Sequence, residues 1–276
     1  MMNNSDKHNN GTTDHHSDNE DDSTPEIVII INCVLNAPLM LISILGNVLV
    51  LAAIIRTPSI RSTHMMMLCS LAVSDLLVGL IAQPIFIAKE LKESRSVEHL
   101  SGMSAYSLSA VSLLTITAIT VDRFLALHYH MRYATLVTES RVKYTLIIIW
   151  FISFLSSGFE VWSERLHSLI VGPGTIICLI ISTFSHIKIS FIVRKHQLQI
   201  LAQQQAAQSS NTGSNLNIAR LKRSAMNTFV FYIALIICYL PMYVLMTLYG
   251  LSIKEWETEW QFAFTAVCIN SSINPC

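Results

Sequence analysis

Two acidic residues lie in stretches of sequence that are otherwise apolar. Asp75 is the only charged residue within 65–88, and Asp122 follows the uncharged run 102–121 and directly precedes Arg123. A carboxylate among apolar residues can bind a cation or be held, charged or protonated, by hydrogen bonds, whereas an adjacent acid and base can restrain one another. These residues could therefore bind a cation, or could form and break an ionic contact.

The elements that must position these residues are helices that cross a membrane. The chain of 276 residues is 52% hydrophobic and only 13% charged, against about 25% charged in soluble domains. A spanning helix needs roughly 20 mostly apolar residues, and in lipid its backbone groups must be paired internally. The apolar stretches are 27–55, 65–88, 102–121, 144–159, 166–187, 224–253 and 261–276. They predict an all-α membrane protein, a seven-transmembrane helix bundle over residues 27–276.

The distribution of charge predicts the orientation of this bundle. Lys and Arg gather in the segments after the first, third and fifth stretches, which places the N-terminus outside the cell. Residues 1–26 are polar and acidic, and we expect an extracellular disordered tail with glycosylation sites at Asn3 and Asn10. The longest inner loop, about 198–219, is rich in Gln, Asn and Ser, and its ends are expected to extend the flanking helices.

Short motifs in the spans carry a resemblance to a known family. They are `GNVLV` in the first span, `LAVSD` in the second, `DRF` at the inner end of the third, Trp150 in the fourth, `CYLP` in the sixth and `NP` in the seventh. In this order they resemble the rhodopsin-like (class A) G-protein-coupled receptors. The absence of cysteines for an outer-loop disulfide, with a short second outer loop, is similar to the melanocortin receptors within the melanocortin, adenosine and cannabinoid group.

The resemblance implies a function at the plasma membrane. Such a multi-pass receptor binds an extracellular ligand and activates a heterotrimeric G protein through outward movement of its sixth helix, and arrestin and membrane lipid are further partners. Neither nucleic-acid binding nor enzymatic catalysis is expected. A second hypothesis is a non-signalling or decoy receptor. A membrane transporter is a third, although neither broken helices nor inverted repeats support it.

The resemblance also implies an ion site around Asp75. The carboxylate would form the floor of a sodium pocket, because carboxylate, hydroxyl and amide oxygens suit a hard cation. The alternative is a carboxyl held by hydrogen bonds between helices, with no ion. Sodium would act as an allosteric modulator that favours the resting state, and no other cofactor is expected. The residues at the pocket positions are Asp75, Ser112, Asn270, Ser271 and Asn274.

A set of residues in the third, sixth and seventh spans matches the family's activation switch. Asp122 would restrain Arg123 at rest, and Arg123 would turn towards the G protein on activation; the alternative is a solvated pair at the membrane edge. Tyr239 stands where the family usually has Trp, and Leu221 removes the acid that would form a second restraint. The switch residues are Asp122, Arg123, Phe124, Tyr239, Pro241, Asn274 and Pro275.

Residues at the inner face would contact the G protein, and residues at the outer side would contact the ligand. His186 replaces a Tyr that supports the active state in the family, so it is either a pH-sensitive substitute or an ordinary solvated histidine. The inner set is Arg123, Leu127, Met131, His186, Arg220, Lys222 and Arg223. The outer set is Gln83, Glu98, Tyr106, Tyr243 and Tyr249.

Two positions narrow the class of ligand, and one feature concerns the end of the chain. Ala105 stands where amine receptors place an Asp, and Cys268 where opsins place the retinal-binding Lys, which argues against both ligand types. A peptide, or a small molecule of lipid or nucleoside type, remains. The sequence stops at Cys276 directly after `NP`, so we expect the seventh helix to be truncated and the eighth to be absent.

Overall fold

The computed structural model describes residues 26–56, 63–92, 94–129, 132–206, 213–251 and 257–273. Every regular element within these ranges is a helix, as the composition predicts. In chain order they are α1 (Glu26–Arg56), α2 (Thr63–Leu77), η2 (Val78–Ala82), α3 (Gln83–Leu91), α4 (Arg95–Tyr129), α5 (Tyr133–Leu136), α6 (Glu139–Trp162), α7 (Glu164–Ala206), α8 (Gly213–Gly250) and α9 (Glu257–Ile273).

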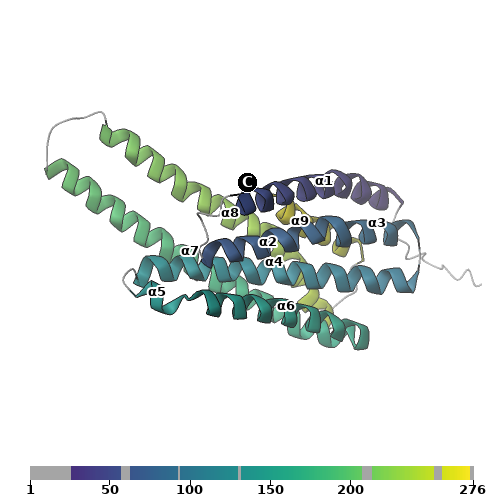
Figure 1. The fold of residues 1–276 in the computed structure, drawn as a ribbon. Coiled ribbons are helices and arrows are strands. Elements are labelled where there is room, and N and C mark those ends of the chain that lie inside the picture. The colour runs from purple at the N-terminus through teal and green to yellow at the C-terminus, as the bar shows by residue number, and fades with distance from the viewer. Residues whose placement is uncertain are drawn as a thin grey trace, which may run out of the picture.

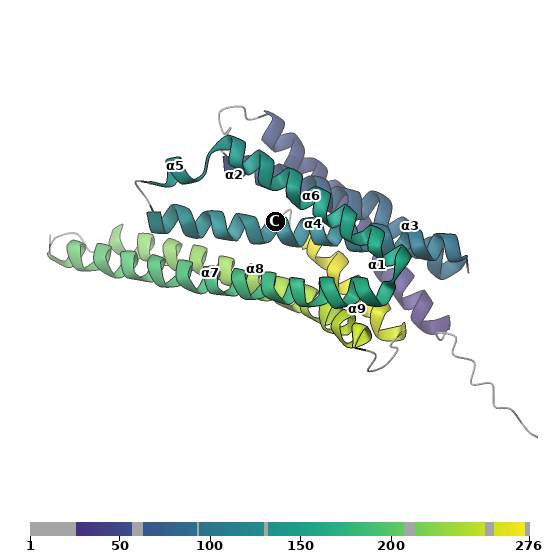
Figure 2. The same ribbon diagram turned by 90° about the horizontal axis from the view of Figure 1, so that it is seen from below.

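The helices pack side by side into an elongated bundle with α4 at its centre (Figures 1 and 2). Helix α4 contacts α2, α3, α6 and α7, whereas α9 packs between α1 and α8. Helices α7 and α8 continue as a pair beyond the rest of the bundle, so most of the predicted inner loop 198–219 is helical in its described parts. At the other end only Ser163 separates α6 from α7.

Six of the described helical segments are long and apolar enough to cross a membrane. They are α1, the continuous segment Thr63–Leu91, α4, α6, α7 as far as Lys195, and the part of α8 from Tyr232 to Gly250. Helix α9, which covers the seventh predicted span, is described over 17 residues. The structure thus confirms an all-helical protein with several candidate spans.

Helix α1 shows how such a helix meets both lipid and protein. Its outward side chains are large and apolar, as at Ile27, Leu41 and Leu49, while its buried residues are all polar: Asn32, Asn36, Ser43 and Asn47. Polar side chains within a membrane are retained where they hydrogen-bond to neighbouring helices. The buried stripe of α1 therefore marks the face that holds α1 in the bundle.

A π-helical turn, η2, interrupts the second span, and the sequence analysis did not predict it. Pro84 has no backbone N–H to donate to the carbonyl one turn earlier, and its ring crowds that carbonyl. The wider turn accommodates this, and the Gln83 N–H donates to the Val78 carbonyl five residues back. The turn sets which residues of α3 face the bundle.

Gly172 allows the backbones of α7 and α8 to approach closely. A Cβ atom there would collide with the Thr247 hydroxyl oxygen and would lie 3.2 Å from the Thr247 backbone nitrogen. Since the backbone cannot move aside cheaply, we expect Gly172→Val to lower the stability by about 1–3 kcal/mol. Thermal unfolding of the purified protein would measure this as a lower midpoint temperature.

Gly174 provides the matched control for this prediction. It lies on the same helix, two residues away, and a Cβ there would meet nothing within 4 Å. Gly174→Val should leave the unfolding midpoint unchanged or slightly higher. Equal losses in both variants would contradict the close-packing explanation.

Candidate functional site

The Asp75 carboxylate lies at a point where three helices meet. Its side chain is fully buried (0% exposed), and its Oδ1 atom accepts hydrogen bonds from Ser112 of α4 at 2.8 Å and Ser271 of α9 at 2.9 Å. Ser74 shares a further hydrogen bond of 2.9 Å with Ser112. The structure therefore brings together three of the residues predicted for the ion pocket.

Helix α1 fixes the backbone around this cluster. Ser43 donates to the Asp75 carbonyl at 2.9 Å, and Asn47 donates to the Ser271 carbonyl at 3.2 Å. Trp150 of α6 ties in the other side of α2 by donating to the Ser70 hydroxyl at 2.9 Å. Asn47 of the first-span motif, the second-span motif and Trp150 of the fourth span thus act as struts that hold Asp75 against Ser271 of α9.

The donor set at Asp75 fits a hard monovalent cation. It consists of carboxylate and hydroxyl oxygens, and the described residues include no cluster of three or more His, Cys, Asp or Glu side chains that could hold a metal ion. Asn270 donates instead to the Tyr239 hydroxyl at 3.3 Å, and Asn274 lies outside the described residues. Three oxygen-bearing side chains of the predicted five are therefore in place.

Tyr239 lies at the centre of the main apolar core. It is fully buried among residues of α4, α7, α8 and α9, and its ring stacks on Tyr243 with centroids 6.1 Å apart. Asn270 donates to the Tyr239 hydroxyl, and the next residue along α9, Ser271, donates to Asp75. Tyr239 thus links α8, which contains Pro241, to the residues around Asp75.

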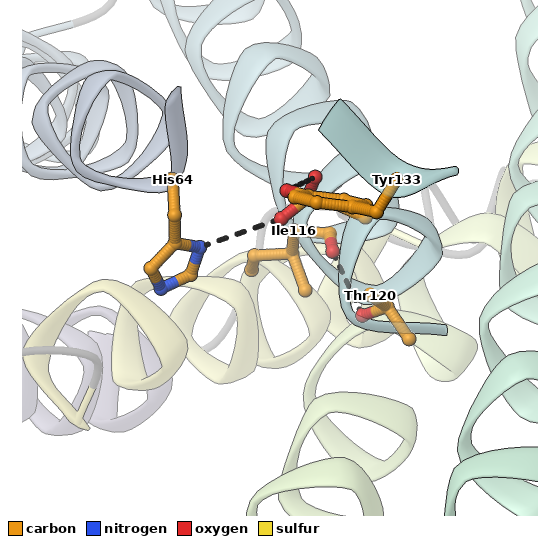
Figure 3. A network of polar contacts seen from close by, with 5 residues as sticks. His64, Ile116, Thr120 and Tyr133 are labelled. Atoms are coloured by element: carbon orange, nitrogen blue, oxygen red, sulfur yellow. Dashed lines mark hydrogen bonds and ion pairs between the residues drawn. The ribbon is translucent and has the colours of Figure 1, made fainter. Parts of the chain in front are cut away.

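Figure 3 shows polar contacts near the C-terminal end of α4, the end predicted to face inward. Asp122 is only 4% exposed; its Oδ1 atom accepts a hydrogen bond of 2.7 Å from the Tyr133 hydroxyl, and its Oδ2 atom lies 3.8 Å from His64 Nδ1. Tyr133 belongs to the short helix α5, and His64 is near the start of α2. Asp122 therefore joins three helices.

The sequence predicted that Asp122 restrains Arg123, but in the structure Asp122 contacts other residues. In the described part of the chain the ion pairs are His64–Asp122 and Lys143–Glu139, and Arg123 is exposed. Consecutive residues on a helix point in different directions, so the two side chains do not face each other. Asp122 is held by Tyr133 and His64, and Arg123 is left at the surface.

Tyr133 is suited to act as the donor in this contact. Partial burial, and next the hydrogen bond to Asp122, raise the pKa of the Tyr133 phenol above its ordinary value. The phenol therefore stays protonated at neutral pH and keeps donating. His64 adds a charge to the contact only when its imidazole is protonated.

His186 lies against neighbouring helices and not in open solvent. Its Nε2 atom is 3.5 Å from the Thr120 hydroxyl, which also donates to the Ile116 carbonyl, and its ring packs on Tyr232 with centroids 4.5 Å apart. Tyr232 also contacts Thr183 through its hydroxyl. His186 thus connects α4, α7 and α8 less than one turn before Asp122 on α4.

At the other end of the bundle, aromatic rings from four helices lie in a row. Tyr106 of α4 packs against His167 of α7 (5.1 Å) and Trp260 of α9 (6.3 Å), and Trp260 meets Tyr249 of α8 at 6.4 Å. The Tyr249 hydroxyl donates to Glu164 at 3.0 Å. His167 is 2% exposed, and its Nε2 atom has no hydrogen-bond partner among the described residues. This outer aromatic row combines apolar area with polar groups.

The predicted ligand set is only partly brought together. Tyr106 and Tyr249 share Trp260, Tyr243 is buried one layer further in, and Glu98 is exposed near the start of α4. Gln83 instead joins a buried network with α1.

The predicted inner residues are also spread out. Phe124 stacks on His128 with centroids 5.4 Å apart, and Leu127 is partly buried. The predicted residues outside the described positions or side chains are Asn3, Asn10, Met131, Arg220, Lys222, Arg223, Asn274 and Pro275.

Several residues of these sites were not predicted. They are His64 and Tyr133 near the C-terminal end of α4, His167 and Trp260 at the opposite end of the bundle, and Asn32 and Asn36 on α1. The polar residues of α1 carried a readable signal, since Asn32 and Asn36 are one helical turn apart in an apolar run. The other residues had no comparable signal, because tertiary contacts select them.

Comparison with known proteins gives consistent matches. The family "7 transmembrane receptor (rhodopsin family)" matches residues 46–165. The rat (Rattus norvegicus) histamine H2 receptor is 34% identical over 134 residues, covering 46% of this chain and 37% of the receptor. The melanocortin receptor 4 of Danio rerio is 30% identical over 177 residues, covering 59% and 53%. The adenosine receptor A3 of Canis lupus familiaris is 32% identical over 117 residues, covering 42% and 37%.

The matched part of the chain spans about half or less of the length of these relatives. The matched residues include the `LAVSD` and `DRF` motifs, Ser112 and Trp150, so they contain most of the struts described above. The matches confirm the resemblance predicted from the motifs: residues 46–165 are similar to the rhodopsin-like seven-transmembrane receptors, which are signalling receptors.

Proposed function

We propose that this protein is a plasma-membrane receptor that binds an extracellular ligand and activates a heterotrimeric G protein. Its N-terminus lies outside, α9 crosses the membrane as the seventh span, and the inner part of α8 moves outward on activation. The observation that carries this proposal is the arrangement at the inner end of α4, where Asp122 is buried and held while the adjacent Arg123 is exposed.

The inner arrangement behaves as a latch between α2, α4 and α5. While Tyr133 and His64 hold Asp122, the inner end of α4 is tied to its neighbours. Release of Asp122 frees α4 to shift, and Arg123 is then available to the G protein. Arrestin would use the same inner surface after activation.

The centre of the bundle would bind sodium, and its outer end would bind the ligand. A sodium ion at Asp75, Ser112 and Ser271 would stabilise the resting packing, because its ligands come from α2, α4 and α9. The outer aromatic row would contact the ligand, for which a peptide or a small lipid-type or nucleoside-type molecule suits the largely apolar surroundings. Tyr239 connects the two regions through Asn270.

Nucleotide exchange tests the proposed function directly. The protein, reconstituted in lipid nanodiscs, is expected to accelerate binding of a non-hydrolysable GTP analogue to at least one class of purified heterotrimeric G protein. Arg123→Ala should reduce this acceleration more than tenfold, since it removes the exposed cation of the switch, a loss of about 1.4 kcal/mol or more.

Lys143→Ala is the matched control for Arg123→Ala. Lys143 is also an exposed cation towards the inner end, paired with Glu139 on α6 at 2.6 Å. Its removal should change exchange less than twofold, because exposed ion pairs contribute little. A well-folded protein that accelerates exchange on no G-protein class would instead favour the non-signalling receptor.

A further inference from the structure

A chain of hydrogen-bonded side chains runs between α1, α3 and α9. Each member donates to the next, in one direction, from Gln83 to Glu90. The successive bonds are Gln83 Nε2 to Asn36 Oδ1 (3.4 Å), Asn36 Nδ2 to Thr265 Oγ1 (2.9 Å), Thr265 Oγ1 to Asn32 Oδ1 (3.0 Å), Asn32 Nδ2 to Gln261 Oε1 (3.1 Å) and Gln261 Nε2 to Glu90 Oε2 (2.8 Å).

This chain is shielded from solvent and almost fully satisfied within itself. Asn32, Asn36 and Gln83 are 0% exposed, and Gln261 and Thr265 are buried. Contacts of this kind hold helices together in a membrane. Two acceptors nevertheless have no donor among the described residues: the Oε1 atom of Gln83 at the first end and the Oε1 atom of Glu90 at the last, both of them buried atoms.

The direction of the chain favours negative charge at Glu90. Each amide places a donor hydrogen on the side towards Glu90, and the Thr265 hydroxyl shares its single hydrogen between Asn32 Oδ1 and the Gln261 backbone carbonyl, each 3.0 Å away. Aligned hydrogen bonds polarise one another. The last donor, the Gln261 amide, hydrogen-bonds to one carboxylate oxygen at 2.8 Å, a bond that is charge-assisted when Glu90 is ionised. The other oxygen keeps unused acceptor capacity in a buried position, which is unfavourable unless a donor arrives.

Glu90 forms no close ion pair with another described residue, although the adjacent Lys89 lies within electrostatic range. A neutral donor would satisfy the hydrogen bond of Oε1 but would leave the charge without a close ion-pair partner. A cationic N–H group satisfies both.

We propose that the Glu90 carboxylate is a recognition site for a cationic N–H group, an ammonium or a guanidinium, carried by the extracellular ligand. The inference rests on the proposed function, because it assigns a positively charged N–H group to the ligand of the proposed receptor. It also locates the carboxylate on α3 and not on α4, where Ala105 stands. Gln261, Asn32 and their hydrogen-bonded neighbours position the carboxylate and support its charge.

Thermal stabilisation by defined cationic probes tests this site without a known ligand and without a G protein. The purified protein in nanodiscs would be heated with benzylamine or with N-acetylargininamide. Benzyl alcohol and N-acetylcitrullinamide serve as neutral analogues of similar shape. At a probe concentration ten times its Kd, we expect a cationic probe to raise the unfolding midpoint by about 3–6 °C. The neutral analogues should raise it by less than about 1 °C.

The variants assign the effect to one carboxylate. Glu90→Gln keeps the size and an acceptor for Gln261 but removes the charge, so the shift should disappear. Lys89→Gln changes the neighbouring charge and should keep the full shift. Glu90→Asp, which retains the charge, should keep part of the shift and serves as the second variant if Glu90→Gln does not fold.

The two cationic probes distinguish a general ammonium or guanidinium group from the side chain of a basic peptide residue. A shift with both cations supports recognition of the charge itself, and a shift with N-acetylargininamide alone supports a basic peptide side chain. No shift with either cation, equal shifts with the neutral analogues, or a full shift in folded Glu90→Gln would overturn the proposal. Failure of nucleotide exchange would leave this readout unaffected, so the two proposals fail separately.

Discussion

Replacing Asp75 by asparagine is expected to abolish the effect of sodium on the stability of the protein. The native protein should unfold at a higher temperature in sodium chloride than in choline chloride of equal ionic strength. Saturation of a site at one hundred times its Kd contributes about 2.7 kcal/mol, or a shift of about 5–10 °C. The asparagine of the Asp75→Asn variant would keep the size of the side chain and an oxygen for Ser112 or Ser271 but would lose the charge that attracts the ion.

Two control measurements distinguish binding of sodium at Asp75 from a general effect of salt on stability. Glu160→Gln removes a different buried carboxylate, on α6, and should retain the full sodium response. Potassium chloride should stabilise the native protein less than sodium chloride does. If Asp75→Asn unfolds cooperatively and still responds to sodium as the native protein does, the ion does not bind at Asp75.

The second large effect is expected from Asp122→Asn, which should raise nucleotide exchange in the absence of ligand. This variant would lose the negative charge that faces His64 and the charge-assisted hydrogen bond from Tyr133. Hydrogen bonds to charged groups contribute about 1.5–3 kcal/mol, so the ratio of active to resting protein should rise about 10–100-fold. The measured basal rate should rise until the active form dominates.

The tyrosine contact offers an independent check on the same latch. Tyr133→Phe removes only the hydroxyl that donates to Asp122 and should raise the basal rate in the same direction, by a smaller factor. Tyr129→Phe is the matched control, because Tyr129 is 43% exposed and does not donate to Asp122. Unchanged basal exchange in both Asp122→Asn and Tyr133→Phe, with normal expression, would show that these contacts do not restrain activation.

The helices could be predicted because the membrane imposes one strong rule on composition. Long uncharged runs specify helices, and the described elements cover most of each predicted stretch. Asp75, Ser112 and Ser271 could also be grouped in advance, although they are far apart in sequence. The resemblance supplied their positions, and the structure supplied the contacts.

The partners of the switch residues could not be predicted in the same way. The adjacency of Asp122 and Arg123 suggested a mutual restraint, but neighbouring side chains on a helix diverge. The partners come from α2 and α5, and a sequence does not show which loop residue folds back against a helix end. The chain that ends at Glu90 was missed for a related reason: Asn32, Gln83 and Gln261 become neighbours only through packing.

The π-turn η2 has a consequence for comparing this protein with its relatives. A π-turn contains an additional residue, so everything after it is rotated by about 100° relative to an uninterrupted α-helix. Gln83 and Glu90 follow this turn, and their direction depends on it. A relative whose second span is a plain α-helix therefore aligns correctly only with a one-residue gap inside Val78–Ala82. Without that gap, mutational results transferred onto α3 would be assigned to side chains on the wrong face.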